Sequence, residues 1–477
     1  MEIFNNIISE LNNYMWSYIL IAVLVVLGTY FTFRTRFVQF KFLPEMIRVL
    51  KDPATVSAEG KRGRSSFQAF TVSLASRVGT GNLAGVATAI SAGGPGAVFW
   101  MWIIALIGAA SSFIESTLAQ IYKVKDADEA EYRGGPAYYM ERGLNKRWLG
   151  VLFAIIIVFT FGLVFSSVQS NTIALAFDQA FGFNRFWMGI ILTIMTAAVI
   201  FGGIKRIAFV SQIIVPIMAV IYLILASFIV VMNFSEIPAM LSLIVKNAFG
   251  LQEVVGGGIG AAVMMGIKRG LFSNEAGMGS APNAAATAAV THPVKQGLIQ
   301  TLGVFTDTLL ICTATAFIII MSGEYTNPDL DGIQLTQAAL TAHVGSWAPA
   351  FVGGAIFLFA FTSIIGNYYY GETNIEFIKE SPTALFIYRL AVIAMVLFGS
   401  VAELAIVWNL ADLFMGIMAL INLVAITLLA KIAMAALKDY REQRKEGKDP
   451  VFYADTIEGL KGIESWEYRK HEESKHK

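Results

Sequence analysis

Two polar interruptions in otherwise apolar sequence carry the residue types that could hold an ion or a small charged molecule. The first lies in the stretch Ser73–Trp102, where glycine, threonine and asparagine occupy Gly79–Asn82 and a basic residue, Arg77, precedes them. In lipid, an unwound backbone persists only inside protein or beside a cavity, because each N–H and C=O needs a partner. Freed amides at the start of a helix can bind a carboxylate, and freed carbonyls can bind a cation. The stretch therefore predicts one half of a binding site.

The second interruption lies in the apolar stretch 252–290, which is too long for a single plain membrane helix. Its middle, GIKRGLFSNEAGMGSAP (Gly266–Pro282), is rich in glycine and charge. We expect a second broken helix here. The alternative is that the glycines only allow close packing between helices, as they often do in membrane proteins. Charged residues beside both interruptions favour the first interpretation.

Six ionisable side chains lie within predicted membrane spans. A charge at that depth costs at least about 2.5–3.5 kcal/mol on insertion scales, so each should pair or face water. Two interpretations are open: a structural network or cytoplasmic gate that holds the broken helices, and direct contact with a solute. Glu275 lies inside the second interruption, where its carboxylate could receive an ammonium group, hold Arg77 or carry a proton. The six are Arg77, Glu115, Lys268, Arg269, Glu275 and Asp307.

The composition is that of a multi-span membrane protein. Of the 477 residues, 56% are hydrophobic and 14% are charged, whereas a soluble domain carries about 25% charged residues. A span needs about 20 mostly apolar residues. We therefore expect an all-α membrane protein with eleven transmembrane helices. They cover roughly 14–33, 66–92, 95–121, 148–176, 186–203, 207–232, 252–290, 296–321, 346–372, 384–402 and 407–431.

The distribution of Lys and Arg predicts the orientation in the membrane. With the N-terminus outside, the segments on the inner side hold 29 Lys and Arg residues and those on the outer side hold two. Positive residues concentrate on the cytoplasmic side of membrane proteins. We expect a multi-pass protein of the cell membrane with an external N-terminus and a cytoplasmic C-terminus.

The order of the spans predicts an internal repeat. After the first helix, the remaining ten divide into two groups of five, and each group begins with its broken helix and enters from the opposite side. Inverted halves with broken helices at corresponding positions mark the central site of transporters. We expect the charged tail to be a solvated helix with a frayed end. The expected divisions are 1–65 for an extra helix and cytoplasmic loop, 66–232 for the first repeat, 233–251 for an extracellular connection, 252–431 for the second repeat and 432–477 for the cytoplasmic tail.

The sequence lacks the residue patterns that other classes of function require. The single cysteine, Cys312, and four scattered histidines offer no disulfide framework, zinc site or nucleophile constellation. A channel would need a continuous polar lining or a repeated filter motif. The sequence contains no basic patch interleaved with aromatic residues, the pattern that would indicate nucleic-acid binding. We therefore expect neither an enzyme nor a nucleic-acid-binding protein, and no cofactor apart from a coupling ion.

The segment GGPGAVFWMWIIALIG (Gly93–Gly108) resembles the signature of the alanine/glycine:cation symporter family, and FWMW is its most specific part. The second motif, SNEAGMGSAP (Ser273–Pro282), the chain length and the eleven spans are also similar to that family. The resemblance covers nearly the whole chain. It implies the five-plus-five inverted repeat of the neurotransmitter:sodium symporters, preceded by one extra helix.

The resemblance also implies roles at the first interruption, which is similar to the first broken helix of the neurotransmitter:sodium group. Thr80 and Gly81 fall where backbone amides hold a substrate carboxylate. Asn82 falls where an amide oxygen ligates sodium. Ala75 and Val78 fall where backbone carbonyls ligate a second sodium ion.

Further ligands are implied in two other spans. In the second broken helix, matching Gly277–Gly279 to the family pattern puts Ser273 at a sodium-ligand position and Met278 at the side-chain pocket. In the ninth span, Thr362 and Ser363 fall where hydroxyl groups ligate sodium, a hard cation that prefers oxygen. The alternative is that these hydroxyls bond back to their own helix.

Several other residues are candidates for contact with the substrate. The fourth span carries FSSVQSN (Phe165–Asn171), which is unusually polar for its depth, although hydrogen bonds between helices are an equal alternative. Asn367 lies four residues beyond Ser363 and thus on the same helix face. Phe272 and Met278 would form a small apolar lid or simply pack. The candidate substrate contacts are Thr80, Gly81, Phe165, Gln169, Phe272, Glu275, Gly277, Met278 and Asn367.

These expectations combine into a sodium-coupled symporter that imports small neutral amino acids, alanine or glycine, by alternating access. Its partners would be the amino acid, sodium and the lipid bilayer. Proton coupling in the same architecture is the alternative, and a channel is less favoured. Arg77 and Glu275 depart from the neurotransmitter group, which has small residues at the matching places.

Overall fold

The computed structural model describes residues 2–55, 63–126, 131–202, 204–251 and 258–469. Within these ranges the chain is almost entirely helical, and its one sheet is a two-stranded antiparallel pair, β1 (Val124–Lys125) and β2 (Tyr132–Arg133). The start of the predicted span 252–290 and the last residues of the predicted tail lie outside the described residues.

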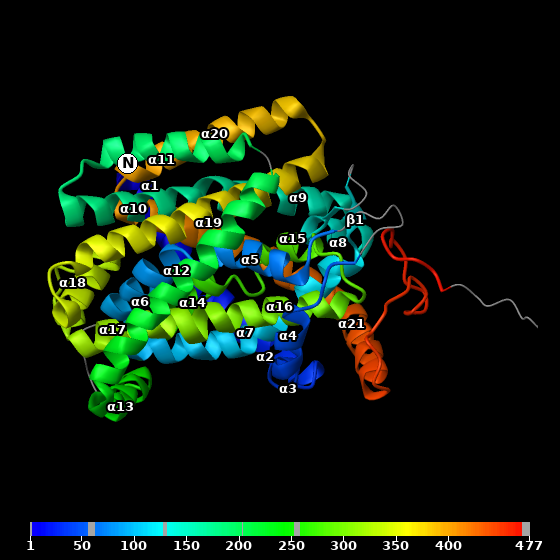
Figure 1. The fold of residues 1–477 in the computed structure, drawn as a ribbon, viewed down its shortest axis with the longest axis horizontal. Coiled ribbons are helices and arrows are strands. Elements are labelled where there is room, and N and C mark those ends of the chain that lie inside the picture. Colours follow the sequence, from blue (N-terminus) through cyan, green and yellow to red (C-terminus); the bar gives the residue numbers. More distant parts are fainter. Residues whose placement is uncertain (1, 56–62, 127–130, 203, 252–257, 470–477) are drawn as a thin grey trace, which may run out of the picture.

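Long apolar helices make up most of the described chain (Figure 1). Seven are long and apolar enough to cross a membrane, or eight if the bent pair Pro216–Met232 and Phe234–Ala248 counts as one span. The predicted count of eleven stays a prediction. A helix that is short or broken is not long enough by itself to be counted as a span. The seven are Asn5–Arg34, Gly96–Ile121, Arg147–Phe181, Pro293–Ser322, Ala348–Ile378, Pro382–Val401 and Leu404–Lys445.

The helices follow one another with short connections. The α-helices are α1 (Glu2–Tyr14), α2 (Ile21–Arg34), α3 (Val38–Lys41), α4 (Leu43–Leu50), α5 (Ser66–Arg77), α6 (Val86–Gly93), α7 (Gly96–Ile121), α8 (Pro136–Arg142), α9 (Arg147–Ile157), α10 (Ser166–Phe181), α11 (Arg185–Ile200), α12 (Ile204–Met232), α13 (Ile237–Ala248), α14 (Ile259–Asn274), α15 (Ala281–Ala286), α16 (Pro293–Val304), α17 (Thr313–Ser322), α18 (Gly332–Val344), α19 (Ala348–Ile378), α20 (Pro382–Val401) and α21 (Leu404–Lys445).

Four π-helical segments and two short 3-10 turns interrupt these helices in the described ranges. A π-helical segment adds a residue to a turn, and such bulges are frequent at functional sites. Two of the four, η2 and η5, contact each other. The π-helical segments are η1 (Met15–Leu20), η2 (Gly81–Gly85), η3 (Val158–Phe165) and η5 (Phe305–Cys312), and the 3-10 turns are η4 (Phe234–Glu236) and η6 (Glu324–Thr326).

The helices pack in two groups, and α5 contacts both of them. In one group α7 contacts α14, α16 and α2, and in the other α10 contacts α19 and α20 while α11 contacts α20. α5 contacts members of both groups, namely α16 and α19. Figure 1 shows α5 and α14 in the middle of the molecule, with α7 on one side and α10, α11 and α20 on the other. The polar interruptions therefore lie where the two groups face each other.

The C-terminal segment is only partly what the sequence predicts. α21 extends to Lys445, but the chain beyond it is not helical and packs against the bundle, so the expectation of a solvated helix is wrong there. Phe452 is buried, and its amide donates to the Thr291 carbonyl at 2.9 Å. The indole Nε1 of Trp466 donates to the Gln120 carbonyl at 3.0 Å. Aromatic side chains among the charged residues fix this segment.

Candidate binding site at the two helix breaks

The first predicted interruption is a true break in the helix. α5 ends at Arg77, and Val78 has extended backbone (φ −79°, ψ 94°) before helical structure resumes. The amide of Gly79 donates to Asn82 Oδ1 at 2.9 Å, and the amide of Thr80 donates to Gln169 Oε1 at 2.9 Å. Buried backbone groups need partners. Side chains therefore supply the acceptors that the broken helix has lost.

The second interruption is also broken, and it depends on glycine. α14 ends at Asn274, Glu275 adopts a left-handed conformation (φ 58°), and Gly277 and Gly279 have φ values of 84° and 85°. Glycine adopts such angles without steric cost. The two oxygens of Glu115, on α7, accept hydrogen bonds from the amides of Gly277 and Gly279, each at 3.0 Å. A buried carboxylate thus caps this loop.

The two breaks are in direct contact. The hydroxyl of Ser76, in the last turn of α5, lies 2.8 Å from Glu275 Oε1 and 2.9 Å from Asn367 Oδ1. The other Glu275 oxygen accepts from the Ser280 hydroxyl at 2.6 Å. A Cβ atom added at Gly81 would lie 3.0 Å from the Ser273 Cα, so only glycine allows this approach without movement. The polar segments of the two broken helices form one buried centre.

The structure groups three of the four residues matched to the second sodium ion. Ser363 Oγ, on α19, lies 2.9 Å from the Ala75 carbonyl oxygen and 3.2 Å from the Val78 carbonyl oxygen. Ser363 Oγ also lies 3.1 Å from the Phe359 carbonyl oxygen of its own helix, and Thr362 donates to carbonyl groups of the same helix, at Leu358 (3.0 Å) and at Phe359 (2.9 Å). A carbonyl oxygen freed by the break thus faces a hydroxyl oxygen, as an oxygen-preferring cation requires.

Residues matched to the first sodium ion gather around the only cysteine. Asn82 Nδ2 lies 3.3 Å from Cys312 Sγ, and Ser273 Oγ lies 3.2 Å from the same sulfur. Asn82 Nδ2 also donates to Asp307 Oδ1 at 2.6 Å. Asp307 and Cys312 both belong to η5.

Aromatic rings line one side of this centre. The rings of Phe165 and Phe272 have centroids 4.6 Å apart, and Phe272 lies 4.8 Å from Trp408. Phe165 ends η3 and Gln169 lies one turn later on α10, so one continuous helix presents both residues. Met278 is fully buried in the loop of the second break. The predicted substrate contacts lie at the first break, on η3 and α10, on α14 and the loop that follows it, and on α19.

The predicted intramembrane charges fall into separate groups. Lys268 Nζ lies 3.3 Å from Asp412 Oδ2, and Arg269 pairs with both oxygens of Asp412 at 2.8 Å and 3.1 Å. Arg77 donates to the Gln300 carbonyl at 3.3 Å, while its Nε and Nη2 atoms have no hydrogen-bond partner among the described residues. In that part of the chain, Arg77 and Glu275 form no ion pair. Of the alternatives open for Glu275, an ion pair with Arg77 is therefore not observed among the described residues.

Sequence reasoning missed four residues of this arrangement. Asp412 lies within the predicted span 407–431, so the rule that selected the other intramembrane charges would have found it. The sequence did not indicate a role in the site for the other three, Ser76, Asn422 and Cys312. A serine, an asparagine or a cysteine in a membrane helix usually forms a local hydrogen bond or packs. Asn422 donates to Glu115 Oε2 at 2.7 Å and to the Gly277 carbonyl at 2.9 Å, which completes the cap of the second break.

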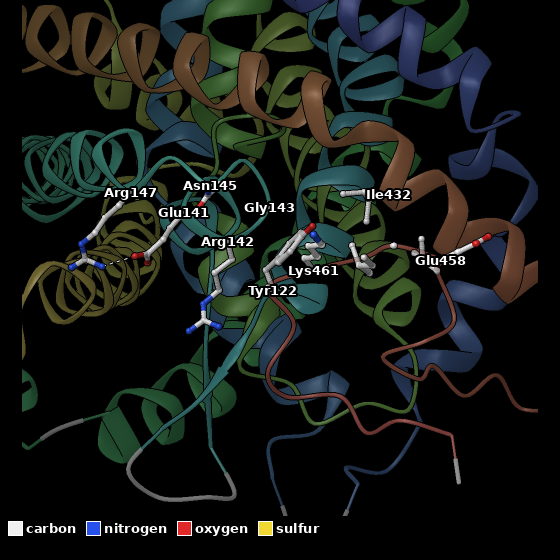
Figure 2. A pocket seen from close by; sticks show the side chains of 13 residues that line it. Tyr122, Glu141, Arg142, Gly143, Asn145, Arg147, Ile432, Glu458 and Lys461 are labelled. Carbon is white, nitrogen blue, oxygen red and sulfur yellow. Dashed lines mark hydrogen bonds and ion pairs between the residues drawn. The ribbon is translucent and has the colours of Figure 1, made fainter. Parts of the chain in front are cut away.

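A large cavity lies away from the two breaks. It has a volume of about 840 Å³ and is lined by the α8–α9 connection, Tyr122, Ile432 and the C-terminal residues 457–462 (Figure 2). None of the predicted site residues lines it. Figure 2 shows charged side chains such as Glu141 and Arg147 pairing beside it. This open, charged hollow at the end of the bundle differs from the buried polar centre at the breaks.

Comparison with known proteins identifies the family. The sodium:alanine symporter family profile matches residues 1–454. The probable sodium/glutamine symporter GlnT of Bacillus subtilis (strain 168) is 58% identical over 465 residues, which cover 98% of this chain and 96% of that protein. The amino-acid carrier protein AlsT of the same organism is 58% identical over 469 residues, with coverage of 98% and 99%. The sodium/alanine symporter AgcS of Methanococcus maripaludis is 38% identical over 451 residues, with coverage of 93% and 98%.

A solved structure shares the fold. A Na⁺-coupled sialic acid symporter in a substrate-bound, outward-open state has a TM-score of 0.52 and 14% sequence identity, and the match covers 92% of this chain and 93% of that one. At this identity the likeness shows the fold alone. That the chain is a transporter and not an enzyme follows from the family profile and the relatives. The family profile and the relatives together establish that this chain belongs to the sodium:alanine symporter family.

Proposed function

We propose that this transporter imports small neutral amino acids, alanine and glycine, together with sodium. The observation that carries the proposal is the contact between the two helix breaks through Ser76 and Glu275, which concentrates polar groups in an apolar bundle. Membership of a family named for sodium and alanine supports sodium and alanine among these solutes. Proton coupling is the alternative.

We propose the membrane arrangement that the sequence predicts. Eleven spans would form one extra helix and two inverted groups of five, 66–232 and 252–431, each beginning with a broken helix. The N-terminus would be external and the C-terminus cytoplasmic, because Lys and Arg concentrate in the segments assigned to the inner side. The two packing groups, both contacted by α5, support rocking of one group against the other.

In the proposed mechanism, sodium binds first. The carbonyl groups of Ala75 and Val78 and the hydroxyl of Ser363 would hold one ion and stabilise the outward-open form. The substrate carboxylate would then replace Gln169 as the acceptor for the Thr80 amide and also reach the Gly81 amide. Coupling follows when sodium and substrate each favour the state that the other needs, since a ligand with equal affinity for both states shifts nothing.

Glutamine is a second candidate substrate. The relative GlnT, named a probable sodium/glutamine symporter, is 58% identical to this chain. The rings of Phe165, Phe272 and Trp408 pack against one another, and this packing favours a substrate with a short side chain. Rotation of Phe272 would be needed to admit a longer side chain.

Uptake into proteoliposomes tests the proposal. Labelled alanine, glycine and glutamine would be offered with an inward sodium gradient alone, with a proton gradient alone and with neither. We expect sodium to drive accumulation of alanine and glycine above the external concentration. Accumulation without sodium would refute sodium coupling, and preferred accumulation of glutamine would replace the proposed substrate.

A further inference from the structure

The C-terminal strap, residues 450–466, lies across the ends of helices that reach the predicted cytoplasmic side. Near its start, the amide of Phe452 donates to the carbonyl of Thr291, just before α16, at 2.9 Å. Near its end, the carboxylate of Glu464 pairs with Arg142 of α8 at 2.7 Å. The strap therefore joins elements that lie far from it in the sequence.

Trp466 is the residue of the strap that reaches the first broken helix. Its ring packs against a small cluster made by Ala69 of α5 together with Ala288 and Val290. Its indole Nε1 donates to the carbonyl of Gln120, in the last turn of α7, at 3.0 Å. The last carbonyl groups of a helix have no partner within that helix, and Trp466 satisfies one of them. One side chain therefore links α5, α7 and the segment that follows α15.

The start of α5 is fastened to that same segment and to α16. The amide of Ala289 donates to the carbonyl of Arg64 at 2.9 Å. The side-chain Nε2 of Gln296, on α16, donates to the hydroxyl of Ser66, the first residue of α5, at 3.1 Å. Trp466 packs beside this joint. This end of α5 therefore moves away from α7 and α16 only if the joint opens and the indole leaves its place.

Between its attached ends the strap is loosely packed. Residues 457–462 line the open cavity of about 840 Å³, and Figure 2 shows Glu458 and Lys461 beside it. The pair of Glu464 with Arg142 is partly exposed, and exposed ion pairs contribute little to stability. Segments with few buried contacts open at a low cost in free energy. The strap can therefore detach while the bundle stays folded.

We infer that the C-terminal strap is a latch, held by Trp466, that keeps the predicted cytoplasmic end of α5 closed. The inference rests on the alternating access of the proposed function, in which the centre at the two breaks opens to the cytoplasm at one stage. The latch favours the state in which that side is closed, and it must release before the solutes leave. Its contacts exist in one state and not in the other, so its strength sets the ratio of the two states.

Alkylation of a cysteine placed beside the indole tests the inference. Ala69→Cys puts a thiol at a fully buried position of α5, and the same proteins without this change give the background from the natural Cys312. Purified full-length protein would be treated with a maleimide in choline, without sodium or amino acid, so that the rate does not depend on transport. Trp466→Ala and Tyr468→Ala would be compared, because Tyr468 is an exposed aromatic residue just beyond the strap.

We expect Trp466→Ala to speed alkylation of Ala69→Cys by about tenfold, the factor that one hydrogen bond and a ring contact typically contribute. Tyr468→Ala should keep the natural rate. Trp466→Phe keeps a ring on the cluster but loses the bond to Gln120, so its rate should lie between the two, and it provides the test if Trp466→Ala does not fold. Rates in Trp466→Ala and Trp466→Phe equal to the natural rate would overturn the inference.

Uptake separates a latch from a contact that only stabilises the fold. A weaker latch leaves a smaller fraction of molecules ready to bind external sodium, and the apparent affinity falls with that fraction. The sodium concentration that gives half-maximal alanine uptake should therefore rise in Trp466→Ala and not in Tyr468→Ala. A lower maximal rate with unchanged sodium dependence would contradict the latch. If the natural chain imported no alanine while Trp466→Ala still exposed Ala69→Cys, the proposed function would fall and the latch on α5 would stand.

Discussion

The side-chain oxygen Oε1 of Gln169 accepts a hydrogen bond from the backbone amide of Thr80 at 2.9 Å. Thr80 is one of the two residues whose amides are proposed to hold the substrate carboxylate. Gln169 therefore occupies, with a neutral oxygen, the position that a negatively charged oxygen of the substrate would take. Binding would then be an exchange in which the amino acid displaces a side chain of the protein.

Substitutions of Gln169 should separate these roles. In Gln169→Glu, a permanent carboxylate would occupy the Thr80 amide and repel the substrate carboxylate, so we expect the KM for alanine uptake to rise by about tenfold or more. In Gln169→Ala the amide would lose its partner but remain accessible, and we expect a smaller change. Uptake kinetics of both variants would show the difference. An unchanged KM in Gln169→Glu would contradict the proposed docking position.

Close packing at the first break predicts the effect of Gly79→Ala. A Cβ atom there would lie 2.7 Å from Gln169 Oε1 and closer still to Ser363 Oγ, so the two side chains would have to move. We expect sodium-dependent uptake to fall strongly while the protein still folds. Gly354→Ala on α19 is the matched control, because a Cβ atom there meets nothing within 4 Å. Equal uptake by the two variants would show that Gly79 is not needed for space at the site.

The ion pair between Arg269 and Asp412 predicts a loss of stability. Asp412→Asn would leave two buried cations, Lys268 and Arg269, without their carboxylate. Breaking a buried pair costs about 3–5 kcal/mol, so we expect a clear fall in the melting temperature of the purified protein. The exposed substitution Asp329→Asn should leave the melting temperature unchanged. If Asp412→Asn had the same melting temperature as the natural chain, the ion pair would not hold α14 against α21.

Much of this arrangement follows from local sequence, and the remainder depends on contacts between distant helices. Glycine and polar residues at Gly79–Asn82 and Gly266–Pro282 predict both breaks, because their conformational needs are local. Local sequence does not predict that Lys268 and Arg269 pair with Asp412, because this ion pair joins helices that are far apart in the chain. The same holds for Glu115, whose two acceptor bonds to the second break require α7 to lie beside it.

The C-terminal segment shows the same limit. A charged tail with few aliphatic residues is typical of a solvated helix, and α21 does continue to Lys445. Beyond it, Phe452 and Trp466 dock on the bundle through backbone and ring contacts. Two aromatic residues outweigh the average polarity of the segment because each buries a large apolar area.

Lys123, at the end of α7, predicts a pH dependence. Its amine is buried against the Ala288 carbonyl and the rings of Tyr132 and Trp466, and burial lowers its pKa from 10.5 to about 7. The unfolded chain therefore binds more protons than the folded chain between these two values, and the free energy of unfolding rises with pH across that range. We expect a gain of about 2 kcal/mol from pH 7 to pH 9.

Thermal unfolding of Lys123→Met is the matched comparison, because methionine keeps the apolar stem without the titrating group. The difference in melting temperature between the natural chain and this variant should narrow as the pH rises. A constant difference from pH 7 to pH 9 would show that the amine of Lys123 does not lose its proton in the folded protein.

The affinity for alanine and glycine, measured at equilibrium in sodium and in choline, tests the central claim most directly. If the two contacting breaks hold both sodium and the amino acid, sodium should tighten binding of alanine and glycine by a typical coupling of about 5–150-fold. Equal affinities in the two salts would contradict the account.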